Sequence, residues 1–407
     1  MGALLTMHMP GLHGFSPRQH EIMALADGLA ARFAKRAAEN DPTSAFPFDN
    51  YRELHAEGYL RLALPRAFGG DGADVFDMVL AQEVLARGDA STALVVGMML
   101  ALLGRVQDSQ AWPEVVLGEV CSKIASEGGT ANNCVTEAEL GSISRGGLPG
   151  MRAERTDGGW LLSGRKIFVT GAPVLRFMAT AVVLPAREDA PQGELVNAIV
   201  EGGSRGLSIE DTWSGALGLR GCGNYAVNYE QVFVPERRIV ERVKVGGERR
   251  PQGVSGWALP LAAVYLGIGQ AALDTACHYA NNRVPSALGK PISSAPHVQQ
   301  WIGDMQVRLH AARTVLHDAA RAWVAGSASS AALGAAIATA KYLCTNAACA
   351  VTETALRVAG GFSMTRALPL ERYFRDARGG LFQPPQDDLA MGMIGRAALA
   401  EERGRRE

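Results

Sequence analysis

Apolar side chains in the first 130 residues recur at the spacing of an α-helix. Within residues 20–40 the apolar positions include Ile22, Leu29 and Phe33, which share one face at 3.6 residues per turn. The same spacing continues through residues 48–64 and 74–100, with Asp49 and Asp89 at positions typical of helix caps. The pattern predicts an N-terminal α-helical domain over residues 15–130.

Between residues 131 and 245 the pattern changes to short alternating runs bounded by Gly, Asp and Pro. Residues 150–172 predict a hairpin that turns at Asp157-Gly158-Gly159, because glycine adopts positive φ at little cost. Residues 176–185, 194–203 and 224–235 predict further strands. We expect a central β-domain over 131–245, either a barrel or a sandwich.

Helical spacing returns at residue 255 and persists. Long helices are predicted over 260–283, 298–326 and 329–359, the third ending at Gly360-Gly361, and a last one over 389–402. Short connections between long helices favour an antiparallel four-helix bundle, here over 246–402. The fold class is therefore α+β multidomain, with two helical domains around a β-domain.

Two of these helices carry more apolar surface than one bundle can bury. Residues 298–325 and 330–358 are apolar around much of their circumference. We expect a homo-oligomer, a tetramer built as a dimer of dimers through the C-terminal bundles.

Composition narrows the possible partners. The 407 residues are 47% hydrophobic with a formal net charge of −1, which fits a globular protein and gives no electrostatic footprint for nucleic acid. The longest apolar run, residues 91–104, is shorter than the ~20 residues that cross a bilayer. The six cysteines form no CxxC pair, so we expect a reducing, cytoplasmic setting and no metal site.

Several local strings, taken in order, resemble one family. Their order along residues 15–400 is similar to that of the acyl-CoA dehydrogenases. The strings are "AFGGDGADVFDMVLAQEVLARGDASTAL", "CVTEAELGSIS", "WLLSGRKIFVTGA", "LGLRGCGNYAVNYEQVFVP", "NNRVPSALGKPI" and "ALRVAGGFSMTRALPLERYFRDAR". The resemblance implies an FAD-containing oxidoreductase that acts on acyl thioesters, with an electron-transfer flavoprotein or a reductase as electron partner.

The resemblance also implies a set of cofactor contacts. The flavin ring side would be served by Val135, Thr136, Ser142, Phe168 and Thr170, and the phosphates by Arg283 and Arg357. Gly360 and Gly361 would allow backbone approach to the dinucleotide of a neighbouring subunit. Without the resemblance, the same residues are an ordinary turn, a strand end, surface arginines and a helix C-cap. Two extra residues between Arg283 and Gly289, and Arg357 in place of the family's glutamine, depart from the pattern on the adenine side.

The sequence departs furthest from the family at the catalytic base. In the resemblance, the glutamate that removes the α-proton falls on Pro384, which has neither a carboxylate nor a backbone N–H. Trp257 occupies the alternative base position of some members, and Gln383 and Pro384 face the substrate beside it, with Ser142. General base catalysis contributes roughly 10²–10⁴-fold, so this loss bears directly on the reaction.

Asp387 and Asp388 are the nearest candidate acids to Pro384. Both also stand where the first turn of the last helix should begin, and a cap role explains them equally without catalysis. Three functions stay open. The protein is a dehydrogenase with a non-standard or absent base, a flavin-dependent monooxygenase that needs no such base, or a flavin-free binding or scaffold protein.

Overall fold

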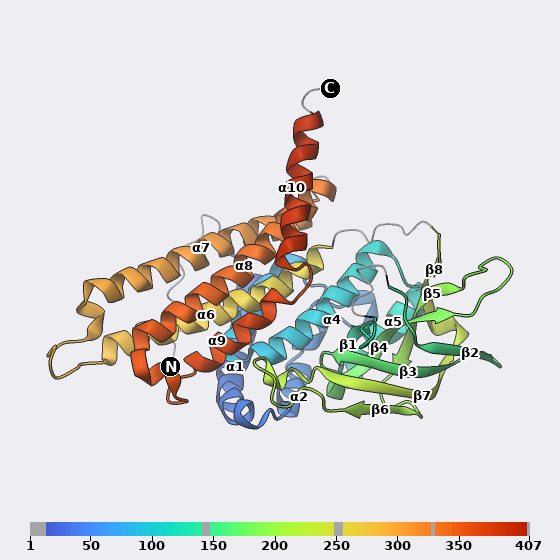
Figure 1. The fold of residues 1–407 in the computed structure, drawn as a ribbon, viewed down its shortest axis with the longest axis horizontal. Helices are drawn as coiled ribbons and strands as arrows, with labels where there is room; N and C mark the ends of the chain where they lie inside the picture. The colour runs from blue at the N-terminus through green and yellow to red at the C-terminus, as the bar shows by residue number, and fades with distance from the viewer. Residues whose placement is uncertain (1–13, 141–146, 248–254, 327–329, 405–407) are drawn as a thin grey trace.

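The structure, a computed structural model, describes residues 14–140, 147–247, 255–326 and 330–404. Figure 1 shows the N-terminal helices in the middle of the molecule, the β-domain on one side of them and the long C-terminal helices on the other. The expected order of helical, β and helical segments is confirmed.

The N-terminal helices begin and end where local caps allow. They are α1 (Pro17–Asn40), α2 (Phe48–Ala56), α3 (Val75–Gly88), α4 (Ala90–Ser109) and α5 (Glu114–Glu127). The helix expected over 48–64 ends early, because Gly58 takes a left-handed φ of 80° and a short 3-10 turn, η2 (Tyr59–Arg61), follows. The pattern over 74–100 forms two helices, divided at Asp89, whose carboxylate accepts from the Ser91 N–H at 3.0 Å.

The β-domain is a sandwich of two four-stranded sheets. One has the order β1 (Thr130–Cys134), β4 (Leu175–Leu184), β5 (Glu194–Glu201) and β8 (Ile239–Lys244); the other has β2 (Arg152–Thr156), β3 (Gly159–Val169), β7 (Tyr225–Pro235) and β6 (Leu207–Glu210). The predicted hairpin joins β2 to β3, with Gly158 at φ 72°. Leu162 of β3 and Val182 of β4 lie in one shared core, so the two sheets pack face to face.

The C-terminal domain consists of α6 (Leu259–Asn282), α7 (Pro296–Ala325), α8 (Ser330–Ala359), α9 (Leu370–Ala377) and α10 (Asp387–Gly404). Helices α6, α7 and α8 pack on one another, and α3 of the N-terminal segment lies against α6 and is buried along its whole length. Helix α10 packs on α8 and projects from the body of the molecule (Figure 1).

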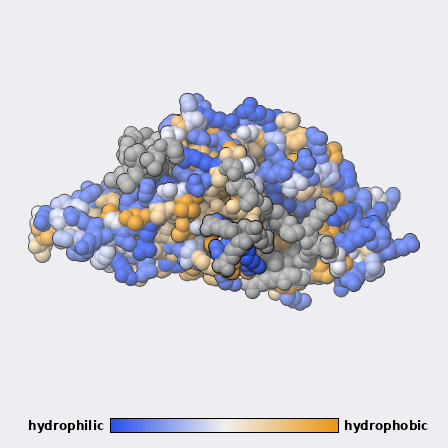
Figure 2. Space-filling model, turned by 90° about the horizontal axis from the view of Figure 1, so that it is seen from above, coloured by the Kyte–Doolittle hydropathy of each residue, from blue (hydrophilic) through white to orange (hydrophobic). Residues whose placement is uncertain are grey.

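Two helices are long and apolar enough to match a membrane span by length and composition, α4 and the segment Gly256–Asn282. Their apolar windows are 78% and 89% buried inside the protein, as expected for core helices. Hydrophobic side chains also reach the surface of the helical half, visible in orange in Figure 2. Val307 and Val324 of α7 are both exposed.

Candidate functional site

The end of strand β3 brings two of the predicted flavin contacts, Phe168 and Thr170, together. Phe168 has a φ of 55° and an exposed ring, and its neighbour Trp213 meets that ring edge to face at 6.2 Å. A left-handed φ is uncommon for a bulky residue and places the ring outside the sheet. Thr170, two residues later, is buried and its hydroxyl donates to the Asn224 side chain at 3.1 Å. An apolar ring and a hydroxyl therefore stand side by side at this strand end.

The loop after β1 lies beside the same strand end. The carbonyl of Thr136 accepts a hydrogen bond from the Ile167 N–H at 2.9 Å, which fixes the loop against β3. Val135 and Thr136 are both half-buried. Ser142, the next residue predicted for the site, lies outside the described residues. The structure thus brings Val135 and Thr136 to the place where Phe168 and Thr170 stand.

Helix α4 connects this strand end to Trp257. Near its first turns, Val95 packs so closely on Gly171 that a Cβ added to that glycine would lie 2.5 Å from the valine side chain. Farther along, the indole of Trp257 packs directly on Gly104. Trp257 lies in the middle of the short 3-10 helix η8 (Gly256–Ala258) and is buried. Nine residues of helix separate Val95 from Gly104, about 13 Å along the axis. The strand end and the indole therefore stand along one helix.

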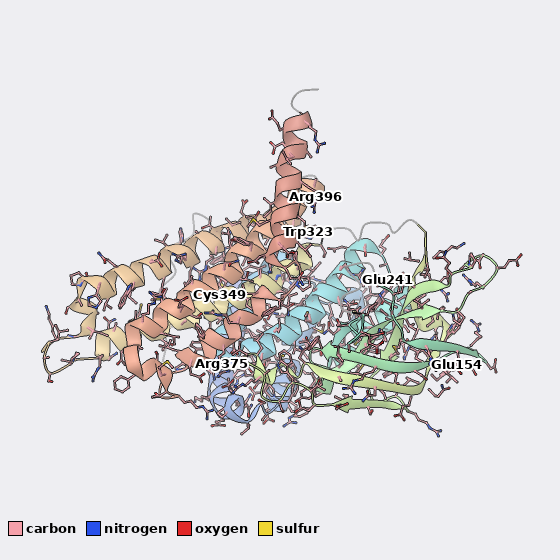
Figure 3. The ribbon with its side chains drawn as sticks, viewed as in Figure 1. Glu154, Glu241, Trp323, Cys349, Arg375 and Arg396 are labelled. Carbon is pink, nitrogen blue, oxygen red and sulfur yellow. The ribbon has the colours of Figure 1, made fainter. Side chains whose placement is uncertain are left out.

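Helix α9 is fixed to the rest of the molecule by the arginine and aspartate of the string "RDAR". Arg375, labelled in Figure 3, binds Asp41 of the N-terminal segment at 2.6 Å and Glu371 at 2.7 Å. The Asp376 carboxylate accepts from the Leu219 N–H at 2.6 Å, and its burial raises its pKa to about 7. The turn η11 (Arg378–Leu381) follows directly, with Gly379 packed on Leu219. These contacts fix the position in space from which the chain continues after residue 381.

The segment with two prolines then leads into α10. Gln383 is half-buried and Pro384 is exposed, and the predicted first-turn aspartates Asp387 and Asp388 are in the first turn of α10. The Asp387 carboxylate accepts from the Asn346 side chain at 3.0 Å, whereas Asp388 is exposed. The two candidate acids therefore have different environments.

Sequence reasoning missed the partner of Asp387 on α8. Lys341 is 7% exposed, and its ammonium lies 3.5 Å from the Asp387 carboxylate. Burial lowers the pKa of Lys341, and the nearby carboxylate raises it in part. Cys349, two turns along the same helix and labelled in Figure 3, contacts the Ala377 carbonyl at 3.5 Å. A single lysine in the Ala-rich stretch "AAIATAKYLC" was the signal that could have revealed this contact.

The residues predicted for the phosphate side gather at the far end of the bundle. The guanidinium of Arg283 stacks on Phe362 at 5.3 Å from the ring centroid, which places it beside Gly360 and Gly361. A Cβ at either glycine would meet nothing within 4 Å, and Gly360 has a φ of 58°. Arg357 is exposed and pairs with Glu353 at 2.7 Å. This group is separated from Trp257 by the whole of α6, about 36 Å long.

The side chains present suit a flavin dinucleotide. Around Thr170 they offer the flat apolar ring of Phe168 and hydroxyl groups. A flavin ring, which has apolar faces and polar edges, requires contacts of both kinds. Arg283 has no ion pair with any carboxylate in the part of the chain that the structure describes, so its guanidinium is available for phosphate. The open surface at Gly360 and Gly361 allows close backbone approach. One chain holds Trp257 and the Arg283 group at opposite ends of α6.

Three family models cover most of the chain. The N-terminal domain of acyl-CoA dehydrogenase matches residues 16–108, the middle domain residues 132–232 and the C-terminal domain residues 258–399. With the relative described next, these matches place the chain in the acyl-CoA dehydrogenase family. The members of this fold are flavoproteins, and FAD is the typical cofactor.

The chain is 36% identical to "Putative acyl-CoA dehydrogenase YdbM" of Bacillus subtilis over 94% of this chain and 97% of that protein. It is 29% identical to L-evernosamine nitrososynthase of a Micromonospora species, over 91% and 87%. Among solved structures, butyryl-CoA dehydrogenase from Megasphaera elsdenii has a TM-score of 0.81 at 22% identity, with 95% of this chain and 99% of that chain covered. Relatives in the family and fold thus include proteins named as dehydrogenases and as a nitrososynthase.

Proposed function

We propose that the chain is an FAD-dependent oxidoreductase that dehydrogenates the Cα–Cβ bond of an acyl thioester or a related substrate. The observation that carries this proposal is the arrangement along α4, where the strand end that holds Thr170 packs near Val95 and the apolar indole of Trp257 packs on Gly104, about 13 Å farther along the helix. The name of the 36% identical relative supports an acyl thioester as substrate. FAD, when bound, takes up the two electrons that leave the substrate.

In this proposal the chain's residues bind and orient the two reactants. Thr136 and Thr170 offer hydrogen bonds to the polar edge of the ring and Phe168 covers one of its faces, while Ser142 remains a predicted contact. Arg283, with Gly360 and Gly361, serves the phosphates of a neighbouring copy, because α6 holds these residues about 36 Å from the same chain's Trp257. Arg357 contributes positive charge if it leaves Glu353.

The α-proton has no glutamate to receive it. Asp387 and Asp388 remain the proposed bases, and they differ in how freely each carboxylate can accept a proton. Removing a proton with Asp387 would disturb the contact of its carboxylate with Lys341, which is buried and would lose its nearest anion. Asp388 is exposed, so solvent can reach it. We therefore assign Asp387 first to holding the wall formed by Gln383 and Pro384.

The test is FAD binding followed by reduction. The purified protein should be yellow, or bind added FAD in calorimetry, and its flavin absorbance should bleach slowly with one member of an acyl-CoA panel. Protein that binds FAD but is bleached by no acyl-CoA would refute the dehydrogenase reading. If the protein binds no FAD at all, the remaining function is that of a flavin-free binding or scaffold protein.

A monooxygenase is the second candidate, and the environment of the base position favours it. Pro384 supplies neither carboxylate nor N–H, and the Asp387 carboxylate is engaged by α8. A reaction that oxygenates its substrate needs no α-proton base. Labelled molecular oxygen separates the candidates, since a monooxygenase inserts one labelled atom into its product and a dehydrogenase inserts none.

The remaining parts of the proposal concern the setting of the enzyme. We propose domains at 15–130, 131–245 and 246–402, a cytoplasmic homotetramer, and an electron-transfer flavoprotein or a reductase as electron partner. The exposed Val307 and Val324 on α7, and the projecting helix α10 with its exposed Leu399, support assembly through the C-terminal domain.

A further inference from the structure

The apolar end of the site is filled by one side chain. Trp257 is 5% exposed, and its indole lies on α4 where Gly104 has no side chain. A Cβ at Gly104 would stand 2.1 Å from the indole, a distance that real contacts do not allow. Glycine inside a helix costs about 1 kcal/mol relative to alanine. The backbone therefore gives up helix stability at the one position where the indole needs room.

Little space remains around this indole. The cavity beside it has a volume of about 10 Å³, at the lower limit for one water molecule. Its lining is apolar and consists of Ala63, Leu64, Met99, Leu100, Leu103, Gly104 and Trp257. The lining side chains come from α4, from η8 and from the loop after η2. An apolar lining suits hydrocarbon, and the indole occupies most of the space that hydrocarbon would take.

Helix α4 is tied to the β-domain next to this space. Arg105, the residue after Gly104, binds Glu241 of β8 through two contacts of 3.0 and 3.1 Å, and Trp112 donates to the same carboxylate at 2.7 Å. Burial raises and Arg105 lowers the pKa of Glu241, with a net lowering that keeps the carboxylate charged and bound. The distance between the strand end and the indole is therefore fixed by the fold.

Trp257 also differs from a tryptophan that serves only as core. Its indole N–H has no hydrogen-bond partner of normal geometry among the described residues, although buried tryptophans usually find one. It lies close to Asp108, where burial raises the pKa of the carboxyl and the indole lowers it. The matched case is Trp323 of α7, labelled in Figure 3, which packs on Gly256 and is not among the residues that line the cavity.

We propose that Trp257, seated on Gly104, sets the length limit of the substrate and restricts it to short, compact acyl groups. This inference rests on the proposed function, because it assumes that the acyl group enters between Thr170 and Trp257. The reacting carbons lie at the strand end, and a longer chain would have to displace the indole from a helix that is tied to the β-domain. Trp257 is thus a residue that determines specificity and takes no part in the transfer of electrons or protons.

Binding calorimetry on the FAD-loaded protein tests the proposal without relying on turnover. The ligands are butyryl-CoA, octanoyl-CoA and dodecanoyl-CoA. The wild type should bind butyryl-CoA best and gain nothing from added methylenes. Trp257→Ala opens a space on the order of the 150 Å³ that accepts a benzene-sized guest. This variant should gain about fourfold in affinity for each methylene that fills the space, which corresponds to ~0.8 kcal/mol per buried CH₂.

Three further variants complete the test. Trp323→Ala removes an indole that packs on Gly256 and does not line the cavity, and it should leave the length preference at its wild-type value. Trp257→Phe removes less volume, keeps an aromatic ring in place and should shift the preference by a smaller amount, so it serves if the alanine variant fails to fold. The double change Trp257→Ala with Gly104→Leu refills the cavity and should restore the short limit.

The outcomes distinguish failure of the length limit from failure of the proposed function on which it rests. A wild type that binds no acyl-CoA of any length defeats the proposed function and the inference with it. A wild type that binds butyryl-CoA and dodecanoyl-CoA equally well leaves the function standing and overturns the length limit. A short limit that persists in both Trp257→Ala and Trp257→Phe would show that another side chain sets it, and the proposal would be wrong.

Discussion

Replacing Asp387 by asparagine should reveal whether this carboxylate anchors the proline wall or acts as a base. The change keeps the shape of the side chain and its link to Asn346 but removes the charge that faces Lys341, an ammonium only 7% exposed. We expect Asp387→Asn to lower the stability of the folded protein, because it leaves a buried cation without its nearest anion. Flavin reduction should fall only as far as the wall loosens.

The structure sets the size of the effect. Charges 3.5 Å apart attract by roughly 5 kcal/mol at an effective dielectric constant of about 20. About a third of the Asp387 side chain is exposed, and solvent reduces this value further. We expect a loss of about 1–3 kcal/mol in the free energy of unfolding. Asp388→Asn is the matched control, since it removes an exposed charge from the same helical turn and should cost about 0.5 kcal/mol.

Urea unfolding and stopped-flow flavin reduction, measured on the same preparations, separate the two roles. Lys341→Met should lose a similar amount of stability, and the double variant should lose less than the sum of the two single changes. The anchor interpretation fails if Asp387→Asn unfolds like the wild type while flavin reduction drops by roughly 10²-fold or more, the loss expected of a missing base.

Four other measurements test the remaining structure. Burial raises the pKa of Asp376 to about 7, so its stabilising contribution is complete below about pH 4 and is lost as the pH rises through 7. Stability should fall by up to about 4 kcal/mol over that range, and Asp376→Asn should flatten the dependence; equal slopes in urea unfolding would contradict this. Arg313→Met removes the closer of the two arginines bound to the buried Glu83 carboxylate, at 2.7 Å, and leaves Arg87 at 3.3 Å, so it should cost about 2–3 kcal/mol; a loss below ~1 kcal/mol in the same assay would refute the estimate. Pro384→Glu with Pro385→Gly should restore bleaching by an acyl-CoA at least ~10²-fold over Pro384→Ala with Pro385→Gly, and no gain would show that the wall is aligned wrongly. Light scattering should give a tetramer, and a monomer would leave the phosphate contacts without a neighbouring subunit.

The fold was predictable from the sequence where periodicity is local. The helical spacing from residue 20 and the alternation from residue 150 both predicted elements that the structure contains. Short elements escaped, among them α5 and α9, because eight to fourteen residues give a weak periodic signal. The break of the second predicted helix at Gly58 depends on one left-handed residue, which hydrophobic spacing does not reveal.

The candidate site was predictable only as far as short strings carry it. Phe168 and Thr170 lie two residues apart, so their association at one strand end follows from the strand itself. The contacts of Trp257 with Gly104 and of Lys341 with Asp387 join segments far apart in the sequence. A glycine in a helix indicates no partner, and a single lysine in an Ala-rich helix indicates burial without indicating which carboxylate it meets, because tertiary packing alone brings these residues together.

The two walls of the proposed site are therefore built by the same physical means. On one side, Pro384, which we propose stands at the position of the family's base, has neither a carboxylate nor an N–H, and the first turn of α10 is held by a buried lysine on α8. On the other side, Trp257 fills the end of the site against a helix that Arg105 and Glu241 hold in place. Both arrangements rest on packing and ion pairs, and neither Pro384 nor Trp257 supplies a proton acceptor. A reaction that requires a base would then take it from the exposed Asp388 or from the substrate. The alternative is a reaction that requires no base.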